Sequence, residues 1–83
     1  MTSDEIKALL EPHFPQAQIE VKSDGYHAQV VIISEVFDGL GPVKRQQLVY
    51  AALNDNIADG SLHAVNMKLY TPEQWQAISL TDA

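Results

Sequence analysis

The chain contains no cysteine, and among its 83 residues this absence excludes more chemistry than any other feature. Without thiols the protein can form no disulfide framework, no cysteine-ligated zinc site and no iron–sulfur cluster held by its own sulfur atoms. A cysteine nucleophile is excluded as well. Any cluster chemistry in which this chain takes part therefore needs sulfur from another molecule.

Basic residues are also few, with five Lys+Arg against eleven Asp+Glu and a net charge of −6. Binding to the phosphate backbone of nucleic acids depends on clustered cations. Lys7, Lys22 and Lys68 are isolated in the sequence, and only Lys44 and Arg45 are adjacent. The composition therefore disfavours nucleic-acid binding unless these cations gather on one face of the fold.

Long hydrophobic runs are missing from the sequence. The longest aliphatic run, Val30 to Ile33, is far shorter than a membrane span. The segment from Met1 to Glu5 lacks the basic region and apolar core of a signal peptide. We therefore expect a cytoplasmic protein that is not inserted in a membrane.

The signatures of common catalytic sites are absent. The carboxylates are scattered singly, no serine has the setting of a nucleophile elbow, and no glycine-rich phosphate loop is present. The segment from Asp38 to Gly41 is typical of a loop and lacks the pattern of a P-loop. We therefore expect a protein that is not an enzyme.

The 83 residues allow one domain, residues 1–83, with one modest core. Apolar spacing, capping residues and turn residues predict an α+β fold with the element order αββαβα and a three-stranded mixed sheet. The predicted elements are residues 2–12, 18–22, 26–34, 42–58 and 63–70, with a last helix capped at Thr71. The second helix has a predicted apolar stripe of Val43, Leu48, Tyr50, Leu53 and Ile57.

His27 and His63 stand near the beginnings of the second and third predicted strands. The helix between these strands is long enough for a parallel crossover, and parallel neighbours begin at the same end of a sheet. With strands about 4.8 Å apart, two imidazoles could reach one metal ion. The alternative is that each histidine is a solvent-facing or capping residue, as we expect for His13 after the first helix.

Lys44 and Arg45 follow Pro42 at the predicted start of the second helix. A helix N-terminus that carries two cations can contact phosphate groups. The alternative is that both cations belong to a solvated helix face. The aromatic side chains fit core or interface packing better than a base-stacking platform, and the residues concerned are Phe37, Tyr50, Tyr70 and Trp75.

Four segments, spaced along most of the chain, occur together in a specific combination. They are Phe37-Asp38-Gly39, Val43 to Tyr50, His63-Ala64-Val65 and Tyr70 to Trp75. With these segments the sequence resembles the BolA family, and the Lys-Arg-Gln-Gln segment and short acidic chain are most similar to its IbaG branch. The resemblance implies a fold similar to class II KH domains, which agrees with the predicted order of elements.

The resemblance also implies a partner and a cofactor. BolA-like proteins pair with cytosolic monothiol glutaredoxins and share a [2Fe–2S] cluster with them. The glutaredoxin cysteine and glutathione supply sulfur, and the BolA-like protein supplies histidine. His63, which precedes Ala64 and Val65, matches the C-terminal histidine ligand of the family. His27 lies where the family has a second histidine or cysteine ligand.

The expected docking surface consists of the segment from Gly39 to Arg45 and the strand end at His63, with Phe37, Gly39, Lys44 and Arg45 as its named residues. On this interpretation the protein is an iron–sulfur trafficking or sensing adaptor. The first alternative is a KH-like nucleic-acid-binding regulator that uses Lys44 and Arg45. The family pattern has a histidine where this chain has Gln46, which weakens that alternative. The second alternative is an interaction module without metal.

Overall fold

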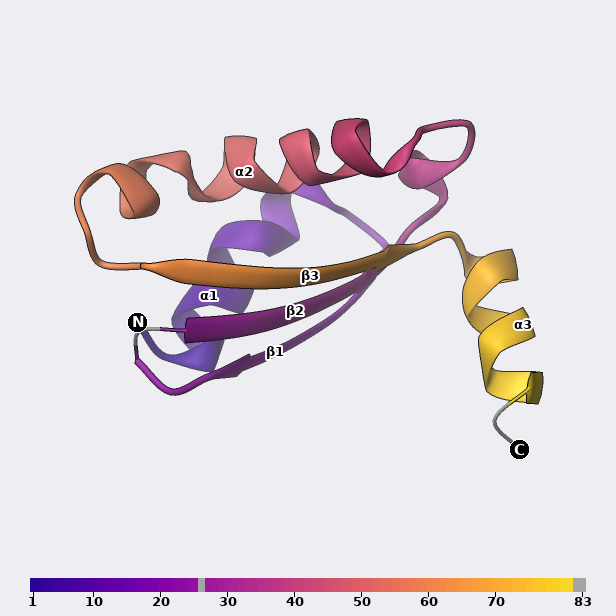
Figure 1. Ribbon diagram of the computed structural model, residues 1–83, viewed down its shortest axis with the longest axis horizontal. Coiled ribbons are helices and arrows are strands. Elements are labelled where there is room, and N and C mark those ends of the chain that lie inside the picture. The colour runs from indigo at the N-terminus through magenta and orange to yellow at the C-terminus, as the bar shows by residue number, and fades with distance from the viewer. Residues whose placement is uncertain (26, 82–83) are drawn as a thin grey trace.

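In the computed structural model, which describes residues 1–25 and 27–81, a three-stranded sheet carries helices along one face (Figure 1). The α+β class and the order of elements are confirmed. The elements are α1 (Ser3–Leu10), a 3-10 turn η1 (Glu11–His13), β1 (Gln18–Ser23), β2 (His27–Ile33), a 3-10 turn η2 (Glu35–Phe37), α2 (Pro42–Ala58), β3 (Ala64–Tyr70) and α3 (Pro72–Thr81). The predicted start of the second strand, Tyr26, lies outside the described residues.

The sheet has the strand order β1-β2-β3, with β2 in the centre. β1 and β2 form an antiparallel hairpin, and β2 and β3 run parallel. A parallel pair needs a connection that crosses back over the sheet, and α2 is that connection. The mixed sheet is thus the one that the sequence predicts.

The core lies between the sheet and the two helices α1 and α2. Alternate residues of β2, Ala28, Val30 and Ile32, face this core because successive strand residues point to opposite sides of a sheet. α1 packs against β1 and α2, and α2 packs against β3. The fully or nearly fully buried cluster is Ile6, Leu10, Phe14, Ile19, Ala28, Val30, Ile32, Phe37, Val49, Leu53 and Leu62.

The buried face of α2 differs from the predicted stripe. Val49 and Leu53 are fully buried, whereas Val43 is 66% exposed and Tyr50 is 43% exposed. The prediction for Leu53 is therefore confirmed, and for Val43, Leu48 and Tyr50, all of them exposed, it is wrong. Apolar residues occur on several sides of this helix, so its sequence does not define a single face. The packing of α2 across β3 decides which of them are buried.

The capping boxes of the first and last helices form as predicted. The backbone N–H of Glu5 donates to Thr2 Oγ1 at 3.1 Å, and the Thr2 N–H donates to Glu5 Oε1 at 3.1 Å. At α3, Gln74 N–H donates to Thr71 Oγ1 at 3.2 Å and Thr71 N–H donates to Gln74 Oε1 at 3.0 Å. Each box satisfies backbone donors that a helix start leaves unpaired.

Candidate histidine site at one end of the sheet

The parallel pairing of β2 and β3 brings His27 and His63 to the same end of the sheet. His27 is the ladder partner of Ala64, and His63 is the residue before Ala64. Strand spacing and residue rise put their α-carbons roughly 6 Å apart. The predicted convergence of the two strand starts is therefore confirmed, and a metal at this position stays a prediction.

Both imidazoles are exposed, and His27 has 69% of its side chain accessible to solvent. His27 lies on the open face of the sheet, because its neighbour Ala28 is buried on the helix face. Ala64, the ladder partner of His27, lies on the open face too. His63 comes one residue earlier, just before β3 begins, so strand alternation does not place it on the same face as His27. The two rings are thus accessible around a strand end and do not line an enclosed cage.

In the part of the chain that the structure describes, no group of three or more His, Cys, Asp or Glu side chains could hold a metal ion. The donor set at the strand ends is two imidazoles. A [2Fe–2S] cluster takes four ligands, so these residues fit such a cluster only as a part of its ligand set. The remaining ligands would come from another molecule.

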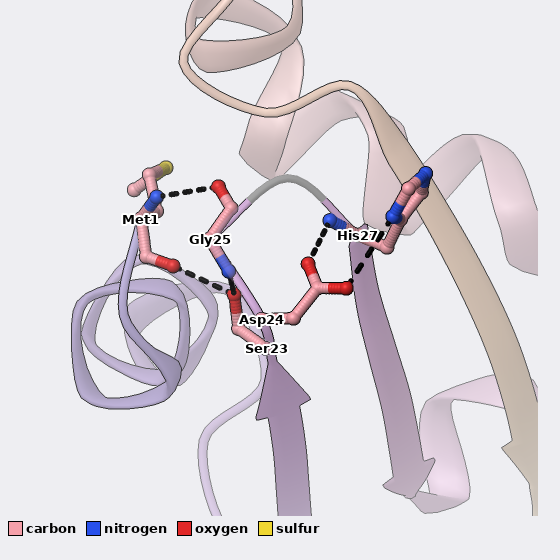
Figure 2. Close-up of polar contacts among 5 residues, drawn as sticks. All are labelled: Met1, Ser23, Asp24, Gly25 and His27. Atoms are coloured by element: carbon pink, nitrogen blue, oxygen red, sulfur yellow. Dashed lines mark hydrogen bonds and ion pairs between the residues drawn. The ribbon is translucent and has the colours of Figure 1, made fainter.

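A short turn carries His27 at the start of β2. Asp24 N–H donates to the His27 carbonyl at 3.1 Å, and His27 N–H donates to Asp24 Oδ1 at 2.7 Å. The second carboxylate oxygen, Oδ2, lies 3.4 Å from His27 Nδ1 (Figure 2). Gly25 has a φ of 104°, a backbone conformation that glycine adopts without strain. The turn therefore contacts both the backbone N–H of His27 and the Nδ1 atom of its ring.

The N-terminal segment is hydrogen-bonded to the same turn. Ser23 Oγ donates to the Met1 carbonyl at 2.6 Å and accepts from Gly25 N–H at 3.1 Å (Figure 2). Ser23 N–H donates to Ser3 Oγ at 3.0 Å. Residues twenty or more positions away in the sequence thus stabilise the turn that presents His27.

A second turn, between α2 and β3, carries His63. The Asp59 carboxylate accepts from Ser61 N–H at 2.8 Å and from Ser61 Oγ at 2.6 Å. These bonds, the hydroxyl bond first, lower the pKa of the Asp59 carboxyl below its ordinary value of 3.8. Leu62, the residue directly before His63, is 1% exposed and packs in the core. His63 is thus held between a capped turn and a strand.

Arg45 points into the molecule and holds three elements together. Its Nε donates to the Leu40 carbonyl at 2.8 Å, and its Nη1 donates to the Leu69 carbonyl at 3.0 Å and to Gln74 Oε1 at 2.7 Å. Its guanidinium carbon lies 5.8 Å from the ring centre of Phe37. The basic pair therefore offers solvent one exposed cation, Lys44, while the Arg45 side chain is engaged internally.

The predicted docking residues do not gather around the histidines. Phe37 is fully buried, so its place on a surface is corrected to a place in the core under Arg45. Arg45 bonds Leu69 near the end of β3, whereas His63 precedes its start, about 20 Å away at strand rise. The crossover explains this separation, because α2 begins where β2 ends and runs back to where β3 begins. Gly39, exposed with a φ of 77°, lies in the loop at the far end.

The fold consists of an antiparallel hairpin, a crossover helix and a third strand parallel to β2, and a comparison with protein families agrees with it. A model of the BolA-like protein family matches residues 5–74. The chain belongs to the BolA family. This confirms the resemblance drawn from the sequence, and the family description names no catalytic activity.

Three relatives of this BolA-like chain illustrate the match. The acid stress protein IbaG of Escherichia coli K12 is 43% identical over 75 residues, which cover 90% of this chain and 89% of that protein. The crystal structure of a bol-like protein from Babesia bovis has a TM-score of 0.82 at 26% identity, covering 95% and 94% of the two chains. The BolA domain of SufE1 from Arabidopsis thaliana has a TM-score of 0.78 at 29% identity, covering 86% and 92%.

The names of these relatives describe a stress protein, a bol-like protein and a domain, and none describes an enzyme. Within the residues that the structure describes, no helix has the length and apolarity to cross a membrane.

Three polar residues around the histidines were not predicted as part of the site: Asp24, Asp59 and Ser61. The turn signal Ser23-Asp24-Gly25 was visible in the sequence, as was the helix end at Asp59-Gly60. Aspartate at such positions often bonds backbone two or three residues ahead. That rule could have located both carboxylates, but it could not show that a ring lies beside one of them.

Proposed function

We propose that this BolA-like chain is a non-enzymatic adaptor that pairs with a monothiol glutaredoxin and contributes histidine ligation to a shared [2Fe–2S] cluster. His63 and His27 are the proposed ligands. The observation that carries the proposal is the placement of two exposed histidines at the starts of neighbouring parallel strands, in a chain without cysteine.

The chemistry of the donor set supports a shared site. Neutral imidazole is a ligand for iron, and two imidazoles leave two positions for the glutaredoxin cysteine and the thiol of glutathione. Histidine in place of thiolate raises the reduction potential of a [2Fe–2S] centre. We expect the mixed cluster to be easier to reduce and more labile than one held by thiolates, which suits transfer or sensing. The proposed compartment is the cytoplasm, where glutathione keeps thiols reduced.

Exposure also favours this role. A ligand that completes a site on another protein must be reachable before the partner arrives, and both histidines are exposed at one end of the molecule. Asp24 bonds the backbone N–H of His27, and the Asp59–Ser61 turn fixes the chain two residues before His63, so we expect little ordering of the backbone on binding.

The test is to mix the protein with a monothiol glutaredoxin, glutathione, iron and sulfide, and to record visible absorption and circular dichroism. The expected result is a spectrum different from that of the glutaredoxin homodimer and altered in His63→Ala and in His27→Ala. His13→Ala is the matched control, because His13 is exposed on η1, away from the two turns. It should leave the spectrum unchanged.

A mixture whose spectrum equals that of the homodimer would overturn the shared cluster. The nucleic-acid alternative would then be tested with Lys44→Glu alone, because Arg45 is part of the folded framework. Loss of salt-dependent DNA binding in that variant would support the alternative.

A further inference from the structure

Asp24 contacts His27 through both of its carboxylate oxygens. Oδ1 accepts the His27 backbone N–H at 2.7 Å, and Oδ2 lies 3.4 Å from the ring nitrogen Nδ1 (Figure 2). The backbone contact alone would complete a turn of a common kind. The ring contact is additional, because only one particular orientation of the imidazole brings Nδ1 to the second oxygen.

Stability does not explain this ring contact. The side chains of His27 and Asp24 are 69% and 67% exposed, and exposed pairs of this kind add little to folding free energy. The turn itself is held by other bonds, from Asp24 N–H to the His27 carbonyl and from Ser23 Oγ to the Met1 carbonyl. The carboxylate is therefore fixed by the backbone, and the ring adjusts to it.

A carboxylate can only accept hydrogen bonds, so the facing ring nitrogen of a neutral imidazole must carry the proton. This leaves the lone pair on Nε2, which points away from the turn. In metal sites of known type, a carboxylate behind a histidine fixes its tautomer and orientation in this way and makes the ring a stronger donor.

We propose that Asp24 is a positioning residue that holds His27 as the Nδ1–H tautomer and presents Nε2 as the atom that ligates the cluster. This inference rests on the proposed function and names the ligating atom and its support. Asp24 itself has no contact with the cluster.

The first test uses the metal-free protein and records the two ring nitrogens of His27 by long-range ¹H–¹⁵N correlation, at a pH where the imidazole is neutral. The wild type should show the Nδ1–H tautomer in excess. In Asp24→Asn the amide oxygen can keep the backbone bond while its NH₂ faces Nδ1, so the population should shift toward Nε2–H. Asp38→Asn, at the far end of β2, is the control and should change nothing.

The second test measures the reduction potential of the shared cluster with wild type, Asp24→Asn and Asp24→Ala. A weaker donor behind His27 should shift the potential upward in both variants, and Asp24→Asn should do so with the turn intact. His27→Ala is the reference. In a chain without the His27 imidazole, substitution of Asp24 should have no further effect on the potential.

These readouts separate the two levels of inference. A wild-type ring in the Nε2–H form, or no tautomer change in Asp24→Asn, would overturn the positioning role whatever the cluster does. A tautomer change without any effect of His27→Ala on the cluster spectrum would place the failure in the proposed ligand instead. Agreement of the tautomer shift with the potential shift would establish both.

Discussion

Arg45 shows how far the role of a single residue can lie from its sequence context. The sequence allows a cation beside Lys44 at the start of a helix to contact a phosphate or to lie on a solvated helix face, yet its guanidinium group bonds two carbonyls and one amide oxygen within the fold. Five donors in a planar group allow one side chain to join the loop after η2, β3 and α3. Lysine, a point charge on a flexible stem, could not replace these bonds.

We predict that Arg45→Ala lowers the free energy of unfolding by about 2–3 kcal/mol, since hydrogen bonds from a charged donor are lost in a partly buried position. Lys44→Ala should stay within about 0.5 kcal/mol of wild type because Lys44 is exposed. Urea denaturation measures both. Equal, small effects of the two substitutions would show that Arg45 is a surface residue in solution.

At the scale of elements, α2 has one face in the core and another that carries apolar side chains in solvent. Val49 and Leu53 are fully buried, whereas Val43 and Tyr50 are exposed. The apolar pattern of the sequence does not separate these two sets, so substitutions on the two faces test the observed orientation of the helix.

For α2, Leu53→Ala should destabilise the protein by about 2–5 kcal/mol, as expected for a cavity in a closed core. Val43→Ala, at a position that is 66% exposed, should change stability by no more than about 0.5 kcal/mol. Thermal and chemical unfolding give the comparison. The reverse ranking would mean that α2 is rotated relative to the described orientation.

The capping box of α1 is predicted to respond to acid. The backbone N–H of Thr2 and, after it, its hydroxyl lower the pKa of the Glu5 carboxyl below the ordinary value of 4.5. The unfolded chain therefore binds this proton more tightly than the folded chain does. The stabilisation is complete above the unfolded value of 4.5 and is lost as the pH falls through the lower folded value.

Replacing Glu5 with Gln should make the free energy of unfolding depend less steeply on pH across this acidic range. Asp59, whose pKa is lowered by Ser61, should contribute in the same direction through the turn before His63. Urea titrations at several pH values give the slope. An unchanged slope in Glu5→Gln would contradict a lowered pKa in the folded state.

At the scale of the whole molecule, the sheet and α3 differ in how firmly they are held. β2 pairs with a strand on each side and is covered by the core. α3 extends beyond the end of the sheet (Figure 1) and is joined to it through the Arg45–Gln74 bond and a ring contact of 5.7 Å between Tyr70 and Trp75.

Hydrogen exchange in the native state should therefore show two levels of protection. Backbone amides of β2 should exchange only when the whole domain unfolds, and those in the first turns of α3 should exchange through local opening. Arg45→Ala should increase exchange in α3 more than in β2. Equal protection of both elements in the wild type would show that α3 unfolds together with the core.

The family relation also acts at this scale. The chain matches IbaG over 90% of its length and the BolA domain of SufE1 over 86%. The same architecture therefore occurs both in IbaG and as a domain of a protein with another name. The two ends of the sheet are separated by the length of β3. A partner that contacts the histidines need not contact the loop at Gly39, and the two surfaces can be tested independently.

The sequence by itself determined what depends on neighbours along the chain. Helix caps at Thr2 and Thr71, the turn at Asp24-Gly25 and the central apolar strand follow from local hydrogen bonds and residue spacing. The absence of cysteine is likewise a property of composition, and it limits the chain to nitrogen and oxygen ligands and the weak thioether of methionine.

Tertiary structure decided what depends on contacts between distant segments. Whether Val49 or Tyr50 is buried follows from how α2 lies across the sheet, and whether Arg45 faces solvent follows from where the end of β3 places its carbonyls. The crossover brings His27 and His63 together and moves Lys44 to the opposite end. No local pattern encodes these outcomes, because each is set by packing free energies that arise only when the whole chain is folded.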